Sequence, residues 1–164
     1  MSTRDSAQGY LDDPRNEQVL VWMDGRLVPR QEARVSVFDS GFVLGDGVWE
    51  GLRLMQGRLV SLDRHLDRLW EGATAIALDI GMTRQALVQA LHDTLAANGM
   101  HDGAHLRLMV TRGVKRTVNQ DPRFVTGRAT VVIVAEYKTP RPELKARGLA
   151  LFTSTFRTSG PDVF

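Results

Sequence analysis

A carboxylate at position 50 interrupts a segment that otherwise has the pattern of an apolar strand. Glu50 alternates with Val48, Leu52 and Leu54, so these four side chains would share one face of the strand. Burying a carboxylate without a counter-charge costs several kcal/mol, so a buried Glu50 requires a cation. Arg107, in the middle of a second alternating segment, is the expected partner because a guanidinium donates two parallel hydrogen bonds to a carboxylate. The alternative is an edge strand that leaves Glu50 in solvent.

Arg68 is the second charged residue that could do chemistry. It lies in a segment with helical periodicity, four residues after Arg64 and three before Glu71. Such spacing on its own indicates a solvated helix face with weak ion pairs. Periodicity therefore does not by itself assign a function to Arg68.

No other set of residues has the spacing of a self-contained catalytic site. His101 and His105 are four residues apart, but Asp102-Gly103 between them breaks any helix, so the four histidines form no metal-binding motif. No serine lies in the setting of a hydrolase nucleophile. The absence of cysteine excludes a disulfide, a thiolate nucleophile and a thiolate metal site. Gly45-Asp46-Gly47 predicts a turn and is a weak signal for phosphate binding.

The composition is that of a globular protein with one full core. Of 164 residues, 43% are hydrophobic and 24% charged, and 21 basic against 19 acidic side chains leave a net charge of +2. So small an excess argues against a nucleic-acid binder. The longest apolar run, residues 129–135, is far shorter than the roughly 20 residues that cross a bilayer. With no cysteine and no signal-peptide pattern, we expect a cytoplasmic protein.

The first half of the chain predicts a hairpin, further strands and two helices. Asp24-Gly25 predicts a tight turn between strands at 19–23 and 26–28. Strands are expected at 35–38, at 48–55 and in a short segment ending at Val60. An amphipathic helix follows from a Ser61 cap to about residue 78, and a second helix begins at a Thr83 cap and ends at Asn98-Gly99.

The second half predicts two strands separated by a long polar loop. Residues 104–111 alternate between apolar and polar side chains, as in a half-buried strand, and residues 129–137 form a β-branched run typical of a central strand covered on both faces. The seventeen residues between them, 112–128, are mostly polar and rich in turn formers, a length typical of a functional loop.

These patterns give four regions. We expect a flexible segment at 1–18, a small α/β domain at 19–137, an interdomain linker at 138–147 and the start of a second domain at 148–164. A strand at 148–156 would have no partner in the remaining sequence, which predicts that the chain is the front part of a longer protein.

Three motifs, in order, carry a resemblance to a known family. They are FDSGFVLGDGVWEGLR at 38–53, LDRHLDRL at 62–69 and HLRLMVTRG at 105–113. Together they resemble the class IV (fold type IV) pyridoxal-phosphate aminotransferases, which include branched-chain aminotransferases, D-amino-acid aminotransferases, aminodeoxychorismate lyases and (R)-selective amine transaminases. The resemblance implies an α+β fold, a two-layer domain with a mostly antiparallel sheet and two helices.

The resemblance also implies roles for individual residues. Arg68 matches the arginine that grips the phosphate of the pyridoxal 5'-phosphate cofactor. Trp49 matches an aromatic residue that lines the substrate pocket, and Glu50 matches a glutamate that pairs with the arginine at Arg107. Leu44 stands where many branched-chain enzymes have a tyrosine, so a hydroxyl near the substrate carboxylate is missing.

The loop after the third motif indicates which branch of the family the chain resembles. D-amino-acid enzymes carry an Arg-x-His pair in the loop after Thr-Arg-Gly, and Thr117 and Asn119 stand at the matching positions here. The resemblance therefore implies a branched-chain aminotransferase or an (R)-selective amine transaminase. It further implies a homodimer in which loop 112–128 contributes to the partner's site.

The lysine that forms the Schiff base in this family follows a Pro-Asp segment like Pro161-Asp162, and the sequence stops at Phe164. Lys115, Lys138 and Lys145 do not lie in that motif. We therefore expect the complete protein to be a transaminase and the 164-residue chain alone to be inactive. The alternative is a non-enzymatic relative that acts as a binding or regulatory module.

Overall fold

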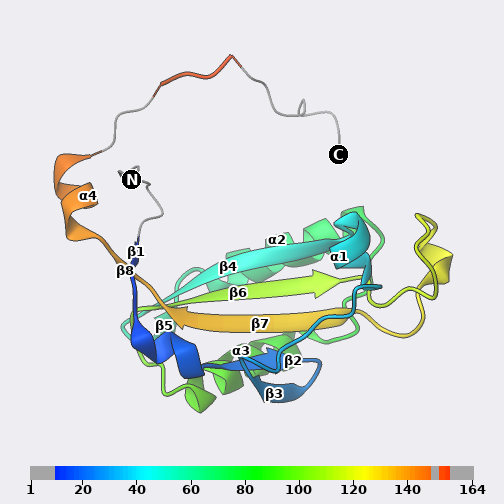
Figure 1. The fold of residues 1–164 in the computed structure, drawn as a ribbon, viewed down its shortest axis with the longest axis horizontal. Helices are drawn as coiled ribbons and strands as arrows, with labels where there is room; N and C mark the ends of the chain where they lie inside the picture. Colours follow the sequence, from blue (N-terminus) through cyan, green and yellow to red (C-terminus); the bar gives the residue numbers. More distant parts are fainter. Residues whose placement is uncertain (1–9, 149–151, 156–164) are drawn as a thin grey trace. The chain divides into compact units, whose positions relative to one another are not determined.

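The computed structural model describes residues 10–148 and 152–155 (Figure 1). Contacts divide the chain into two units, one formed by residues 14–137 and the other by the segments on either side. The last residues of the expected flexible segment 1–18 are therefore structured, because Pro14–Gln18 forms a 3-10 helix (η1) of the larger unit. Asn16 fixes this helix by exchanging two hydrogen bonds with the backbone of Tyr137, at 2.8 and 2.9 Å.

A six-stranded antiparallel sheet forms one layer of the larger unit, in the order β3-β2-β7-β6-β4-β5. The expected α+β class with an antiparallel sheet is confirmed. The strands are β2 (Leu20–Met23), β3 (Arg26–Pro29), β4 (Gly47–Met55), β5 (Arg58–Leu59), β6 (Ala104–Thr111) and β7 (Thr130–Tyr137).

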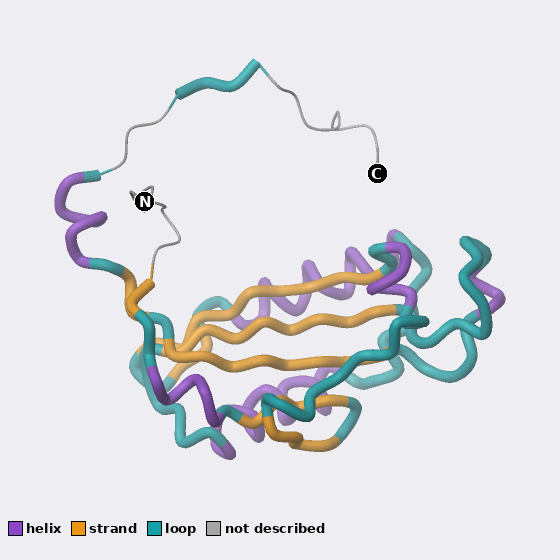
Figure 2. The backbone as a smooth tube through the Cα atoms, in the orientation of Figure 1, coloured by secondary structure: helices purple, strands orange, loops and turns teal. Residues whose placement is uncertain are grey.

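Two long helices, α2 (Leu62–Ala75) and α3 (Arg84–Ala97), cover one face of this sheet (Figures 1 and 2). Thr83 caps α3 as expected, its hydroxyl accepting a hydrogen bond from the Ala86 amide at 3.1 Å. Ser61 precedes α2 but its side chain makes no cap bond, because its backbone has a φ of 52°. The core lies between helices and sheet, and its fully buried members include Leu52, Leu66, Leu69, Leu87, Leu91, Leu106, Leu108 and Ile133.

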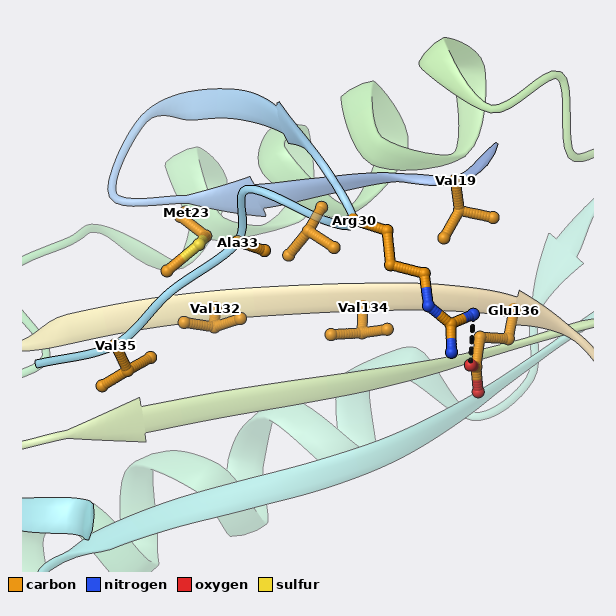
Figure 3. A pocket seen from close by; sticks show the side chains of 9 residues that line it. Val19, Met23, Arg30, Ala33, Val35, Val132, Val134 and Glu136 are labelled. Carbon is orange, nitrogen blue, oxygen red and sulfur yellow. Dashed lines mark ion pairs between the residues drawn. The ribbon is translucent and has the colours of Figure 1, made fainter. Parts of the chain in front are cut away.

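The opposite face of the sheet is crossed by residues 30–38 (Figure 3). We expected a strand at 35–38, and this is wrong: the segment makes no strand pairing. Chain reversal after β3 explains it, because the amides of Glu32 and Ala33 both bond the Pro29 carbonyl and turn the chain over the sheet. The segment leads into a short helix, α1 (Ser40–Leu44), where only a glycine turn was expected.

Loop 112–128 folds back on itself instead of extending. Lys115 pairs with Val125 in an isolated antiparallel bridge, and the Arg116 amide donates to the Phe124 carbonyl at 2.8 Å. A 3-10 helix, η2 (Pro122–Phe124), lies within it, capped by Asp121. The side chain of Arg123 lowers the pKa of Asp121 to about 2 by hydrogen bonding to its carboxylate.

The second unit contains a two-stranded antiparallel pair, β1 (Tyr10–Leu11) with β8 (Thr139–Pro140), and the helix α4 (Pro142–Arg147). Within the expected linker at 138–147, the structure has a short strand, β8, and the helix α4. Of the expected strand at 148–156, residues 149–151 and 156 lie outside the described residues, and the described residues, 148 and 152–155, are not in a strand. Among the described residues, no helix is both long and apolar enough to cross a membrane.

Candidate functional site

Glu50 lies at the centre of a three-residue cluster between β4 and α2. Its side chain is only 2% exposed, and each carboxylate oxygen accepts a hydrogen bond of 2.6 Å from Arg68, one from Nε and one from Nη2. His65 Nδ1 lies 2.8 Å from the second of these oxygens. The cluster therefore satisfies the buried carboxylate with one bidentate cation and one imidazole.

The helix positions both partners of Glu50. His65 and Arg68 are three residues apart on α2, so they lie on the same side of the helix. Leu66, Leu69 and Ala73 are buried against the sheet and fix the rotation of the helix about its axis. As a result, the two polar side chains meet β4 at the position of Glu50.

The cluster keeps Glu50 ionised. Burial raises the pKa of its carboxyl, but the hydrogen bonds and charges of Arg68 and His65 outweigh burial, so the pKa lies below its ordinary value. The hydrogen bond to Glu50 in turn raises the pKa of Arg68.

The expected pairing of Glu50 with Arg107 was wrong. In the register of β4 and β6, Glu50 lies opposite Leu108, and Arg107 lies opposite Gly51. Side chains of neighbouring residues in a strand point to opposite faces, so Glu50 faces the helices while Arg107 faces away from them. The cation for Glu50 comes from the helix, through Arg68.

Arg107 instead stacks on Trp49. Its guanidinium carbon lies 4.0 Å from the centre of the Trp49 ring, on the face of the sheet that the helices leave uncovered. Such cation–π contacts favour a parallel arrangement of guanidinium and indole and leave the guanidinium N–H groups directed outward around its rim. Trp49 remains 59% exposed, so the stacked pair presents a polar and an aromatic surface together.

A pocket of about 390 Å³ opens beside Trp49 on the same face. Its lining is largely apolar and includes Val35, Phe42, Trp49, Met109 and Val132. Leu44, expected near the substrate, lies at the end of α1 and is not one of the lining residues, although its neighbours Phe42 and Gly45 are.

Asp39 fixes the positions of the polar residues that line this pocket by hydrogen bonding. Its carboxylate is completely buried and accepts hydrogen bonds from the Gly41 amide and from the hydroxyls of Thr111 and Thr130, at 2.9, 2.9 and 2.8 Å. One side chain thereby connects α1, β6 and β7. A Cβ at Gly41 would overlap the Thr111 side chain, so glycine permits this close approach.

The residues of the site lie on both faces of the sheet, along the exposed edge of β4. In the part of the chain that the structure describes, β5 pairs only with Leu54 and Met55, so β4 from Gly47 to Arg53 has no strand on its outer side. The Glu50 cluster lies on the face of the sheet that the helices cover, and the Trp49–Arg107 pair lies on the opposite face.

Comparison with known proteins identifies the family of this chain. A profile of the family described as amino-transferase class IV matches residues 47–163, most of the chain. The chain belongs to the class IV aminotransferases.

The chain is similar to branched-chain aminotransferases both in sequence and in fold. Branched-chain-amino-acid aminotransferase-like protein 1 of Arabidopsis thaliana is 40% identical over 152 residues, which cover 93% of this chain and 27% of that protein. The crystal structure of the branched-chain aminotransferase from Thermoproteus uzoniensis with norvaline superposes with a TM-score of 0.63 at 34% identity, over 73% of this chain and 40% of that chain.

A second similar structure contains a cofactor derivative. It is a branched-chain amino acid aminotransferase from T.th., complexed with N-(5'-phosphopyridoxyl)-L-glutamate, and it superposes with a TM-score of 0.62 at 27% identity, over 72% of this chain and 40% of that chain. This class IV aminotransferase chain thus spans well under half the length of these relatives.

Arg112 is a residue of the aminotransferase chain that the sequence did not single out. Its guanidinium forks the Asp46 carboxylate at 2.7 and 2.9 Å and donates to the carbonyls of Ile76 and Ala77, both at 2.7 Å. It therefore ties the glycine turn before β4 to the end of α2, the helix that carries Arg68.

His65 and Asp39 were also missed. His65 could have been recognised from its spacing, since it precedes Arg68 by three residues on a helix. Asp39 directly follows Val37 and Phe38, but the sequence does not show that its carboxylate is buried, because that burial depends on the packing of three elements around it.

Proposed function

We propose that the complete protein is a pyridoxal-phosphate-dependent aminotransferase that moves an amino group from a branched-chain amino acid to a 2-oxo acid. The observation that carries this proposal is the bidentate clamp of Glu50 on Arg68. Pyridoxal phosphate, when bound, supplies the electron sink that amino-group exchange requires.

The chemistry of Arg68 fits a phosphate. Glu50 takes two of the five guanidinium N–H groups, which leaves three for an anion, and the Arg68 side chain is 68% exposed. Because both bonds to Glu50 fix the plane of the guanidinium, its outer edge is preorganised for the oxygens of a phosphate. In this proposal His65 holds Glu50 in place from the other side.

The uncovered face of the sheet would receive the substrate. The pocket beside Trp49 offers apolar surface to an aliphatic side chain and excludes water from it. The Arg107 guanidinium, stacked on Trp49 and not engaged with Glu50, is placed to donate hydrogen bonds to the substrate carboxylate. Leu44 would contribute apolar surface at the end of α1, without the hydroxyl of a tyrosine.

Residues 1–164 alone are proposed not to catalyse the transfer. Lys115 is buried and its ammonium donates to the Asp121 carbonyl at 3.0 Å within loop 112–128, so it is not presented to either face of β4. We also propose a homodimer in which loop 112–128 reaches the partner's site. Its compact fold and the exposed Val118 at its surface support a contact role.

The test compares two arginines of the same helix in the complete protein. Arg68→Ala should weaken the affinity for pyridoxal phosphate roughly 10–100-fold, the loss expected for charged hydrogen bonds. Arg64→Ala removes the same charge four residues earlier, where the side chain is exposed, and should leave the affinity unchanged. Equilibrium dialysis or cofactor fluorescence measures both.

Equal affinity in the two variants would refute the role of Arg68. The substrate class is checked separately, by amino transfer from L-leucine and from an (R)-amine to 2-oxoglutarate in the unaltered protein. Transfer from the amine alone would refute the branched-chain assignment.

A further inference from the structure

A second hollow lies on the uncovered face of the sheet, under the segment that crosses from β3 to α1 (Figure 3). Its volume is about 270 Å³. It shares Val35 and Val132 with the pocket beside Trp49 but is centred on β2 and β7. Neither the family resemblance nor the proposed transfer reaction uses it.

The floor of this hollow is aliphatic. Val21 and Met23 of β2 lie beside Val132 and Val134 of β7, and all four side chains line the hollow. The register explains the grouping, because Met23 lies opposite Val132, so these alternate residues of the two strands point to the same face.

One end of the hollow carries a pair of opposite charges. Arg30 Nη1 lies 3.7 Å from Glu136 Oε1, and Figure 3 shows the two side chains meeting at the end of β7. Arg30 is held there from behind, since its amide donates to the Val19 carbonyl at 3.1 Å and its Nη1 donates to the Asn16 carbonyl at 2.7 Å. The two side chains are 49% and 30% exposed.

These features are complementary to one class of small molecule. A free α-amino acid carries a carboxylate and an ammonium on one carbon, which match Arg30 and Glu136, and an aliphatic side chain would cover the valines of the floor. A carboxylate without an amine would place its charge beside Glu136, and an amine without a carboxylate would place its charge beside Arg30. An ion pair as long as 3.7 Å between partly exposed side chains contributes little stability, so a zwitterion can replace this one pair at small cost.

We propose that this hollow is a second, non-catalytic binding site for a free α-amino acid with an aliphatic side chain. Arg30 binds its carboxylate, Glu136 binds its ammonium, and Val21, Met23, Val132 and Val134 contact its side chain. The site is small for a ligand pocket, which suits a molecule of amino-acid size. The proposal does not depend on the proposed function, because no residue of the Glu50 cluster takes part.

Methionine methyl signals test the site directly. Met23 lines this hollow, whereas Met109 lines the pocket beside Trp49, so one labelled protein reports on both. In the complete protein labelled with [methyl-13C]methionine, a titration with L-leucine should shift the Met23 signal in a saturable way. A Met23 signal that stays in place up to solubility-limited L-leucine would overturn the proposal.

The ligand's two charges provide the first control. 4-Methylpentanoate and isopentylamine each carry the same alkyl chain with one charge, and each should bind at Met23 at least tenfold more weakly than L-leucine. Equal shifts from all three would show a nonspecific apolar groove and overturn the amino-acid assignment.

Two variants provide the second control. Arg30→Gln and Glu136→Gln should each weaken the Met23 response to L-leucine at least tenfold and leave that of Met109 unaltered. Unchanged Met23 affinity in both would refute the proposal. The Met109 response reports independently on the substrate pocket, so failure of the proposed function and failure of this site are distinguishable, and unchanged signals of Met82 and Met100 verify that each variant is folded.

Discussion

At residue 50, one carboxylate determines the position of two helical side chains. Glu50 is buried on the face of β4 that contacts α2, and it holds Arg68 by both oxygens and His65 by one. Glu50 determines how much this cluster contributes to the free energy of unfolding, because it is the buried partner and would remain desolvated if its hydrogen-bond donors were removed. Arg68 keeps most of its surface in solvent and remains able to bind an anion.

Glu50→Gln should lower the free energy of unfolding by about 1–3 kcal/mol at neutral pH, because an amide cannot accept all the hydrogen bonds that the carboxylate accepts. The pKa of Glu50 lies below its ordinary value of 4.5 in the folded protein. Its contribution to stability is therefore fully present above that pH and is lost as the pH falls through the lowered pKa. Urea denaturation of both proteins between neutral and acid pH measures this difference.

Glu71→Gln is the matched control, since Glu71 is exposed on the same helix. It should leave the free energy of unfolding unchanged. A difference between the wild-type protein and Glu50→Gln that persists undiminished at the acid end would contradict the ion pair as the source of the stability.

At the level of elements, loop 112–128 is anchored where it leaves β6. Gly113 has a φ of 104°, and a Cβ at this position would overlap the Arg128 carbonyl oxygen at the other end of the loop. The Gly113 carbonyl also accepts a hydrogen bond from the Ser40 amide at 2.9 Å. One glycine thus joins the two ends of the loop and attaches them to α1.

Gly113→Ala and Gly127→Ala separate backbone strain from close approach. Gly127 has a φ of 108°, so alanine is strained at both positions, but nothing lies within 4 Å of a Cβ at Gly127. Gly113→Ala should cost at least about 2 kcal/mol more than Gly127→Ala, because only the former forces backbone atoms apart. Thermal denaturation of the two variants measures the difference, and equal melting temperatures would exclude the close approach as a source of stability.

The periodic elements were well predicted and the irregular ones were not. The strand at 104–111 has the expected bounds and alternation, and α2 and α3 begin within one residue of the expected positions. Segment 30–38 has strand-like residues yet crosses over the sheet, because the turn after Pro29 directs it away from an edge. The local sequence pattern does not specify the direction in which the turn after Pro29 sends the chain.

At the scale of the whole molecule, the sheet separates two kinds of surface. Its helix face carries the Glu50 cluster, and its other face carries the Trp49–Arg107 pair and both hollows. The exposed edge of β4 lies between them. In the proposed dimer, loop 112–128 of one subunit would complete the site beside this edge in the other.

Subunit mixing tests that arrangement. In the complete protein, at a cofactor concentration too low to fill the weakened site, Arg68→Ala should inactivate a subunit's own site. Val118→Asp in loop 112–128 should inactivate the partner's site by placing a charge on an exposed apolar side chain. Mixed after dissociation and reassociation, the two inactive proteins should recover up to about one quarter of the wild-type activity, because half of the dimers are hybrids with one intact site. No recovery on verified mixing would contradict a loop that acts in the partner.

The sequence by itself determined the family, the antiparallel sheet with two helices, and the apolar strand face on which Glu50 lies. These depend on local order: three motifs in sequence and the alternation of apolar residues every second or every 3.6 residues. The same alternation places Arg107 on the face opposite Leu106 and Leu108, so the pattern already contained evidence against the expected pairing with Glu50.

Only the tertiary structure decided which cation meets Glu50. That choice depends on the register of β4 against β6 and on the rotation of α2 above them, which place Arg68 and His65 at the carboxylate and put Arg107 on Trp49. The same holds for Asp39, Arg112 and the Arg30–Glu136 pair, whose partners lie on other elements. Contacts between distant segments arise from packing, which no short stretch of sequence specifies.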